Sequence, residues 1–311
     1  MVKKVNYPNL YIVGAPKSGT TSLYHYLDQH PDITIPDKEP RFFIKEVIKN
    51  VNDADPIKEY LLRSSILEED AYQELFQNSR EKIRCDASTQ YLFHHKEVIP
   101  QIQKVSVEEP KILIMLRNPV DRAFSNYQHN LSFVETLSFE QALEQEKERV
   151  DKQYNSFWYY KGLSQYADGV KAYLSAFENV KVVFFEDFTN DTNLALSDIF
   201  KFLEVDASFN PSEFLINKKS TGTPKVKWLN NLFNSISKTD GFKKVFYTFL
   251  GKERTRLIKE IVFRKNLTKS KVILSDKTRR LLEQHFKADI IKLKEVLSLQ
   301  TISWLDNGTD S

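Results

Sequence analysis

Residues 11–27, "YIVGAPKSGTTSLYHYL", constrain the fold more than any other part of the chain. They begin as a continuous apolar run, which is typical of a parallel strand buried on both faces, and end in a helical pattern. Two glycines, at positions 14 and 19, allow a sharp turn in between. A strand, a glycine turn and a helix in this order predict the first unit of an α/β fold.

The turn in this segment carries the side chains of an anion-binding loop. Backbone amides at the start of a helix point outward and carry partial positive charge, so an anion can bind there. A cation and four hydroxyls surround the second glycine, in the run Lys17, Ser18, Gly19, Thr20, Thr21 and Ser22. We therefore expect this turn to hold a phosphate group.

The position of the lysine separates this loop from the phosphate loop of ATP- and GTP-cleaving enzymes. Those enzymes follow the pattern G-x-x-x-x-G-K-[ST], in which the lysine reaches the β- and γ-phosphates. Here Thr20 occupies the position of that lysine, and Lys17 lies three residues earlier, inside the turn. A lysine inside the turn reaches the first phosphate and the group attached to it. The loop therefore predicts a site for a 5′-phosphate with one transferable group, rather than for a triphosphate with magnesium.

Further strand and helix patterns follow along the chain. Strands are expected at 82–86, 111–116 and 180–186, and helices at 21–30, 119–131, 138–150, 163–177 and 192–205. This alternation predicts an α/β fold with a doubly wound, mostly parallel sheet flanked by helices. From about residue 210 a polar loop precedes three helical stretches, of which the last covers 277–297. The simplest interpretation is a single domain, 1–311, with a loop and helical C-terminal subregion at about 210–300.

A second anion site is expected at the end of the strand at 111–116. Arg117 lies at its carboxyl end, where ligands of open α/β sheets bind, and Ser125 follows two turns into the next helix. An arginine can grip a phosphate with two parallel hydrogen bonds, and a serine can add a third. Arg122, on the same helix, is a surface alternative.

Composition excludes several classes of function. The net charge is only +3 and no long block of like charge occurs, which argues against a general nucleic-acid binder. Cys85 is the only cysteine, so intramolecular disulfides and multi-cysteine zinc sites are excluded. No histidines or carboxylates have convincing metal-ligand spacing, so no essential metal is expected. No signal peptide and no apolar run of about 18 residues is found, which predicts a cytoplasmic protein without a membrane span.

Two motifs together resemble a known family. "APKSGTTSLYHYLDQHP" and "LRNPVDRAFSNY" closely resemble the nucleotide-binding motifs of sulfotransferases. The resemblance continues in "DKEPRFF" (37–43), in "DASTQYLF" (86–93) and in the final helix, and is closest to the carbohydrate (heparan-sulfate-like) and bacterial branch. It implies the donor 3′-phosphoadenosine 5′-phosphosulfate and the product 3′,5′-adenosine bisphosphate. The first motif would bind the 5′-phosphosulfate, and Arg117 with Ser125 the 3′-phosphate.

The resemblance also implies catalytic roles. Glu39 matches the general base of the carbohydrate branch, and Lys17 is the candidate cation for the leaving group. A loop glutamate beside two phenylalanines can be partly desolvated, which favours proton transfer. The sequence leaves other candidates for the base and for substrate contacts. His95 and His129 are alternative bases, and Lys38, Arg41, Ser88 and Tyr91 are tentative substrate contacts.

A polar loop at 217–225 resembles the region that closes over the nucleotide in this family. Its candidate contacts are Lys218, Ser220, Gly222 and Lys225. The expected function is sulfuryl transfer to a small-molecule or oligosaccharide acceptor, through a hydroxyl or amine, without nucleic acid as a partner. Two alternatives remain at this stage. A P-loop kinase or NTPase would need a magnesium ligand such as Glu186 or Asp187, and a nucleotide-binding module would have no chemistry.

Overall fold

The computed structural model describes residues 7–36, 39–212, 272–300, 302 and 304, and the backbone of two short strands at 223–224 and 267–268. The chain divides into two compact units. The first unit comprises Met1–Asn126, Leu137–Leu215 and Ser275–Ser311, and contains the main sheet. The second comprises Tyr127–Thr136 and Ile216–Leu274. In it β6 (Thr223–Pro224) pairs antiparallel with β7 (Leu267–Thr268).

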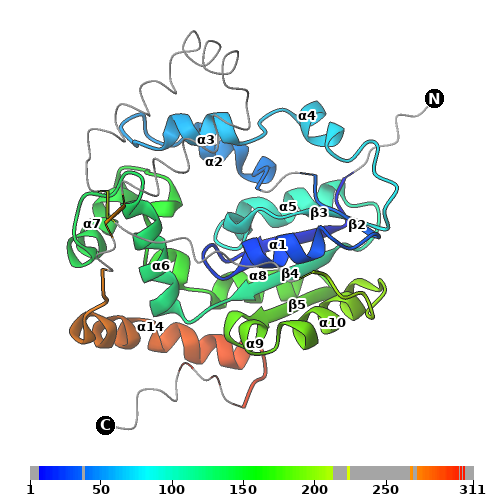
Figure 1. The fold of residues 1–311 in the computed structure, drawn as a ribbon. Coiled ribbons are helices and arrows are strands. Elements are labelled where there is room, and N and C mark those ends of the chain that lie inside the picture. Colours follow the sequence, from blue (N-terminus) through cyan, green and yellow to red (C-terminus); the bar gives the residue numbers. More distant parts are fainter. Residues whose placement is uncertain are drawn as a thin grey trace. The chain divides into compact units, whose positions relative to one another are not determined.

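A five-stranded sheet with the order β2-β3-β1-β4-β5 forms the centre of the first unit (Figure 1). Every neighbouring pair in it is parallel. The strands are β1 (Leu10–Gly14), β2 (Ile33–Thr34), β3 (Ile83–Asp86), β4 (Lys111–Leu116) and β5 (Asn179–Phe184). This arrangement confirms the predicted α/β fold, because apolar strands buried on both faces favour parallel pairing with helical crossovers.

Helices cover both faces of this sheet. On one face, α1 (Thr20–Leu27), α9 (Phe185–Asn190) and α10 (Thr192–Leu203) bury Leu23, Phe188 and Phe200 in one core with the strands. On the other face lie α5 (His95–Val105) and α8 (Ala167–Ala176) (Figure 1). Right-handed crossovers produce this division, because the chain moves from β1 toward one edge and then returns toward the other.

The remaining helices of the described residues flank this core. They are α2 (Lys45–Lys49), α3 (Lys58–Ser64), α4 (Glu69–Glu74), α6 (Pro119–Leu131), α7 (Phe139–Asp151) and α14 (Asp276–Val296). In the sequence, Ser138 and Gln141 have the spacing of a helix-capping signal, and at the start of α7 they form a reciprocal capping box. On α8 packs α14, whose Asp289 accepts from the amide of Tyr166 at 2.7 Å, at the start of α8. No helix in the described ranges is long and apolar enough to cross a membrane.

Three details differ from the sequence-based expectation. The strand expected to reach residue 186 ends at Phe184, because α9 begins there and Thr189 bonds back to the carbonyl of Glu186. The segment before Glu39, where the sequence showed no strand pattern, contains β2, whose Ile33 is buried beside β3. The helix expected from 163 begins at Ala167, after a 3₁₀ turn at Gly162–Ser164. Two of the three C-terminal helical stretches lie outside the described residues.

Candidate active site

The phosphate loop runs from the end of β1 to the start of α1. The Ala15 amide donates to the Met115 carbonyl at 2.6 Å, which ties the loop to β4. Gly19 has φ +88°, and a Cβ there would lie 2.6 Å from the Phe185 ring. At Gly14 a Cβ would lie 2.8 Å from the Thr89 carbonyl oxygen. Both positions therefore require glycine, as the strand–turn–helix pattern predicted.

One buried hydroxyl in this loop has unused hydrogen-bond capacity. Ser18 is fully buried, and its Oγ makes no hydrogen bond of standard geometry with the described residues, although it interacts with the Tyr166 hydroxyl. Of the other hydroxyl residues, Thr20 and Ser22 are buried and Thr21 is exposed. A buried hydroxyl with unused hydrogen-bond capacity is costly, and beside helix amides an anion is the natural partner for it. Two properties of the loop therefore suit a phosphate group: the glycine turn and the unused hydrogen-bond capacity of a buried hydroxyl.

Arg117 lies beside the phosphate loop, directly after β4. Its Nη1 donates to the Lys17 carbonyl at 3.3 Å, and its guanidinium lies 4.7 Å from the centroid of the Phe185 ring. The backbone oxygen of Arg117 accepts from the Tyr166 hydroxyl at 2.9 Å. The half-buried Ser125 follows on α6. The structure thus brings the two candidate anion-binding elements together at one end of the sheet.

Arg122 is not the surface residue that the sequence suggested. It is fully buried and donates to Ser164 Oγ at 2.6 Å, Asn126 Oδ1 at 3.2 Å and the Tyr160 carbonyl at 2.9 Å. Burial lowers the pKa of its guanidinium to about 10. The expectation was wrong because the inner face of α6 meets the Tyr160–Ser164 turn, which supplies acceptors for the guanidinium.

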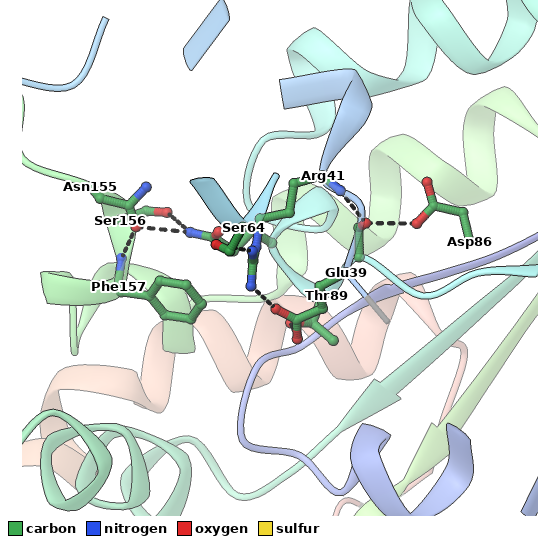
Figure 2. Close-up of polar contacts among 10 residues, drawn as sticks. Glu39, Arg41, Ser64, Asp86, Thr89, Asn155, Ser156 and Phe157 are labelled. Atoms are coloured by element: carbon green, nitrogen blue, oxygen red, sulfur yellow. Dashed lines mark hydrogen bonds and ion pairs between the residues drawn. The ribbon is translucent and has the colours of Figure 1, made fainter. Parts of the chain in front are cut away.

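Glu39 is held by two neighbours, as Figure 2 shows. Thr89 Oγ1 donates to Glu39 Oε1 at 3.0 Å, and Arg41 Nη2 forms an ion pair with Oε2. The side chains of Glu39 and Arg41 are only 17% and 8% exposed, so this is not an ordinary surface pair. Both residues have positive φ, +62° and +56°. The carboxylate is therefore fixed in place.

The same turn that holds Glu39 also touches the phosphate loop. The Leu92 amide donates to the Val13 carbonyl at 2.7 Å, and the Thr89 carbonyl closely approaches Gly14. The 3₁₀ turn Thr89–Tyr91 therefore links the carboxylate of Glu39 to the end of β1. The phosphate loop and the candidate base therefore contact the same turn.

Ser88 and Tyr91 are fully buried, and their hydroxyls are occupied. Ser88 Oγ donates to Asp86 Oδ1 at 2.6 Å, and Tyr91 OH donates to Asp86 Oδ2 at 3.0 Å. Burial raises the pKa of Asp86 to about 6, against the hydrogen bonds from Ser88, Tyr72 and Tyr91 that lower it. As substrate contacts, Ser88 and Tyr91 stay a prediction. In the structure they hold a buried carboxylate.

The two alternative bases have other neighbours. His95 Nδ1 is 3.3 Å from the Leu92 carbonyl at the start of α5, and the exposed His129 packs its ring against Phe133 in the second unit. His94, which precedes His95 in sequence, is half-buried, and desolvation lowers its pKa to about 4. The remaining candidates lie outside the described residues: Lys38, Lys218, Ser220, Gly222 and Lys225.

A kinase would need a magnesium ligand at Glu186 or Asp187, and one of these residues makes a structural hydrogen bond. Glu186 Oε1 accepts from the Asn118 amide at 2.9 Å, and Asp187 is exposed on α9. In the part of the chain that the structure describes, no group of three or more His, Cys, Asp or Glu side chains is placed to bind a metal ion. The geometry around β5 therefore adds no support to the kinase alternative.

Sequence reasoning missed the residues that hold Glu39. Thr89 and Asp86 lie about fifty residues further along the chain, so no local pattern connects them to Glu39. The run "DASTQYLF" at the end of β3 did signal a site at this edge of the sheet. It gave no means of telling which of its side chains faces the base.

Comparisons with known proteins agree with this geometry. Residues 8–253 match the family model described as the sulfotransferase domain. A crystal structure of a sulfotransferase from Alicyclobacillus acidocaldarius is 32% identical, with a TM-score of 0.73, and the match covers 97% of this chain and 100% of that one.

Curated relatives match over a shorter stretch. The bifunctional heparan sulfate N-deacetylase/N-sulfotransferase 2 of Homo sapiens is 32% identical over 128 residues, which are 39% of this chain and 13% of that protein. Carbohydrate sulfotransferase 15 of Rattus norvegicus is 29% identical over 149 residues, which are 39% of this chain and 27% of that protein. The matched stretches are thus small parts of these relatives, whereas the family model and the bacterial structure match most of this chain. The chain belongs to the family of enzymes that carry the sulfotransferase domain.

Proposed function

We propose that this protein transfers a sulfuryl group from 3′-phosphoadenosine 5′-phosphosulfate to a hydroxyl or amine of a saccharide-like acceptor. One observation carries the proposal: the turn that holds the Glu39 carboxylate also packs against the phosphate loop. A base fixed next to a 5′-phosphate site is what in-line transfer from that phosphate needs.

The donor would be held at two points. The loop amides with Ser18, Thr20 and Ser22 would take the 5′-phosphate, and Arg117 with Ser125 the 3′-phosphate. The bond from Arg117 to the Lys17 carbonyl supports this division, because it places a second cation beside the first loop. The unused hydrogen-bond capacity of the buried Ser18 hydroxyl supports an anion in the loop itself.

In the reaction, the acceptor oxygen or nitrogen attacks sulfur in line with the bond that breaks. Glu39 would take the acceptor's proton through a carboxylate oxygen. The bond between sulfur and the bridging oxygen breaks, and its electron pair stays with the 5′-phosphate. Lys17 would neutralise the charge that develops on that oxygen. The ion pair with Arg41 would hold the Glu39 carboxylate in position for this step.

A saccharide acceptor is favoured by the relatives, whose names refer to heparan sulfate and to carbohydrate. A natural-product hydroxyl remains the second acceptor class. The cytoplasmic location, the absence of an essential metal and the single-domain organisation all stay predictions.

Transfer can be tested directly with defined probes. The protein is incubated with the donor and N-deacetylated heparosan, chondroitin oligosaccharides or simple glycosides, and mass spectrometry detects a gain of one sulfuryl group. Glu39→Gln should lower turnover by about 10²- to 10⁴-fold and leave the affinity for 3′,5′-adenosine bisphosphate unchanged.

Glu59→Gln is a matched control, because Glu59 pairs with Arg63 on an exposed helix, with an N–O distance of 3.6 Å. It should leave both turnover and nucleotide affinity unchanged. Full transfer activity in Glu39→Gln would remove Glu39 as the base. A protein that binds no adenosine bisphosphate would overturn the proposed donor.

A further inference from the structure

A buried carboxylate at the end of β3 accepts hydrogen bonds from three hydroxyl groups. Asp86 is fully buried. Its Oδ1 accepts from Ser88 at 2.6 Å, and its Oδ2 accepts from Tyr72 at 2.7 Å and from Tyr91 at 3.0 Å. An ionised carboxylate only accepts hydrogen bonds, so each hydroxyl has to turn its proton toward Asp86. The lone pairs of the three oxygens then face away from it.

Two of these hydroxyls meet the segment that carries Glu39. Ser88 Oγ accepts from the Arg41 amide at 2.9 Å, and the Tyr91 oxygen accepts from the Phe43 amide at 3.2 Å. Figure 2 shows the first of these chains, from Asp86 through the serine to the backbone of Arg41. Asp86 thereby sets the direction of both hydroxyls, and the hydroxyls fix two backbone amides.

The backbone of this segment needs such support. Glu39 and Arg41 both have φ in the left-handed region, at +62° and +56°. This conformation costs free energy for residues other than glycine, and it persists only where surrounding contacts stabilise it. The hydrogen bonds to the Arg41 and Phe43 amides lie on the C-terminal side of Glu39 and help to hold the backbone in this conformation.

We propose that Asp86 is a positioning residue for sulfuryl transfer, which aligns Glu39 through the hydroxyls of Ser88 and Tyr91. It acts on the backbone of residues 41–43 and does not touch the acceptor or the donor. The proposal rests on the proposed function, in which Glu39 is the base. Proton transfer depends on placement within a fraction of an ångström, so a shifted segment lowers turnover without weakening nucleotide binding.

A pair of tyrosines provides a matched test. Tyr91 and Tyr72 are both fully buried, and both donate to the same oxygen of Asp86, but only Tyr91 accepts from a backbone amide of this segment. Tyr91→Phe should lower kcat by about 10- to 100-fold, with unchanged affinity for adenosine bisphosphate. Tyr72→Phe loses a similar bond and retains the ring that stacks on Phe42 at 4.3 Å, so kcat should stay within about twofold of the wild-type value. Ser88→Ala should behave like Tyr91→Phe.

A double-mutant cycle tests whether the effect passes through Glu39. In a Glu39→Gln background, Tyr91→Phe should cause no further loss of kcat, because the group that it aligns is already absent. A crystal structure of each single variant supplies a readout that is independent of activity. The backbone of residues 39–43 should shift in Tyr91→Phe and Ser88→Ala, but not in Tyr72→Phe.

The outcomes separate the proposal from the function on which it rests. Equal loss of kcat in both tyrosine variants, additive loss in the cycle, or an unmoved segment in Tyr91→Phe would overturn the positioning role of Asp86. Wild-type turnover in Glu39→Gln would instead overturn the base assignment. A wild-type protein that transfers nothing would overturn the function, and the three crystal structures would still decide whether the hydroxyls of Ser88 and Tyr91, which bond to Asp86, fix the segment.

Discussion

The phosphate loop and the Glu39 segment contact the same turn but are built in different ways. In the loop, β1, the glycine turn and α1 are contiguous in sequence, and the two glycines are required by backbone geometry. Both regions contain non-glycine residues with left-handed φ, Lys17 in the loop and Glu39 and Arg41 in the segment, but the Glu39 side chain and the amides of its segment are held by Thr89, Ser88 and Tyr91, far along the chain. A site built from contiguous residues can be recognised from a short motif. A site held in place by residues far away in the sequence cannot.

This difference separates what each region controls. A change in the phosphate loop should alter the charge or the hydrogen bonds that the proposed donor meets. A change in the network around Asp86 should alter the free energy of unfolding, because its groups are buried, and a change at Ser88 or Tyr91 should also alter the placement of Glu39. The following predictions use this division, from the largest expected effect to the smallest.

Among the variants that follow, replacement of the loop lysine should have the largest effect. Lys17→Met removes the cation proposed to neutralise the leaving oxygen and keeps the length of the side chain. We expect kcat to fall by about 10²- to 10³-fold, as for other single groups that stabilise developing negative charge. Steady-state transfer assays and calorimetry with 3′,5′-adenosine bisphosphate measure turnover and affinity separately. A loss confined to affinity, with normal kcat, would contradict a role at the bond that breaks.

The pH dependence of stability should report the network around Asp86. The pKa of Asp86 is about 6 in the folded protein, against about 3.9 for an unfolded aspartate. Between these values the folded state binds more protons, so the free energy of unfolding falls as the pH rises, by about 3 kcal/mol in total. Tyr72, Tyr91 and Glu39 are the ionisable groups that act on Asp86 directly.

Asp86→Asn supplies the control for that measurement. Urea unfolding of both proteins at about pH 4.5 and about pH 7.5 gives the difference in the free energy of unfolding at each pH. Relative to the variant, the wild-type protein should lose stability as the pH rises. A difference that is constant with pH would mean that Asp86 does not titrate in this window, and the buried network would then carry no special cost at neutral pH.

Arg117 should control affinity for one part of the nucleotide. Removal of a hydrogen-bonding group from a charged partner costs about 1.5–3 kcal/mol, or roughly 10- to 150-fold in affinity. Arg117→Ala should therefore weaken the binding of 3′,5′-adenosine bisphosphate by such a factor, as calorimetry would measure. The binding of 5′-AMP, which lacks the 3′-phosphate, should change little. Equal losses for both nucleotides would place Arg117 at the 5′-phosphate instead.

The sequence predicted the parts of this molecule that local physics determines. Four strands, the capping box at Ser138 and the glycine turn follow from apolar runs and short motifs, and the structure contains them. Burial of Arg122 was not predictable, because its acceptors come from the turn at 160–164, about forty residues away. The same holds for Thr89, whose bond to Glu39 spans fifty residues. Motif resemblance indicated Glu39 but not what keeps it in place.

The smallest expected effect is also the most direct test of the local half of the site. Ser18 is fully buried and its hydroxyl has unused hydrogen-bond capacity, so the free protein bears the desolvation cost of that group, and a bound phosphate would relieve it. Ser18→Ala should therefore raise the free energy of unfolding of the nucleotide-free protein by about 1 kcal/mol. Affinity for 3′,5′-adenosine bisphosphate should fall by about tenfold, at the lower end of the range for one hydrogen bond to a charged group.

Ser164→Ala provides the contrast, since that buried serine accepts from Arg122 at 2.6 Å and donates to the Tyr160 carbonyl at 2.9 Å. Its loss should lower stability and leave nucleotide affinity unchanged. Thermal unfolding with and without nucleotide measures both quantities, because the stabilisation by a ligand grows with the logarithm of its affinity. Opposite signs of the stability change in the two serine variants would establish that the loop hydroxyl is kept for a ligand rather than for the fold. A loss of stability in both would mean that Ser18 already has its partner within the protein.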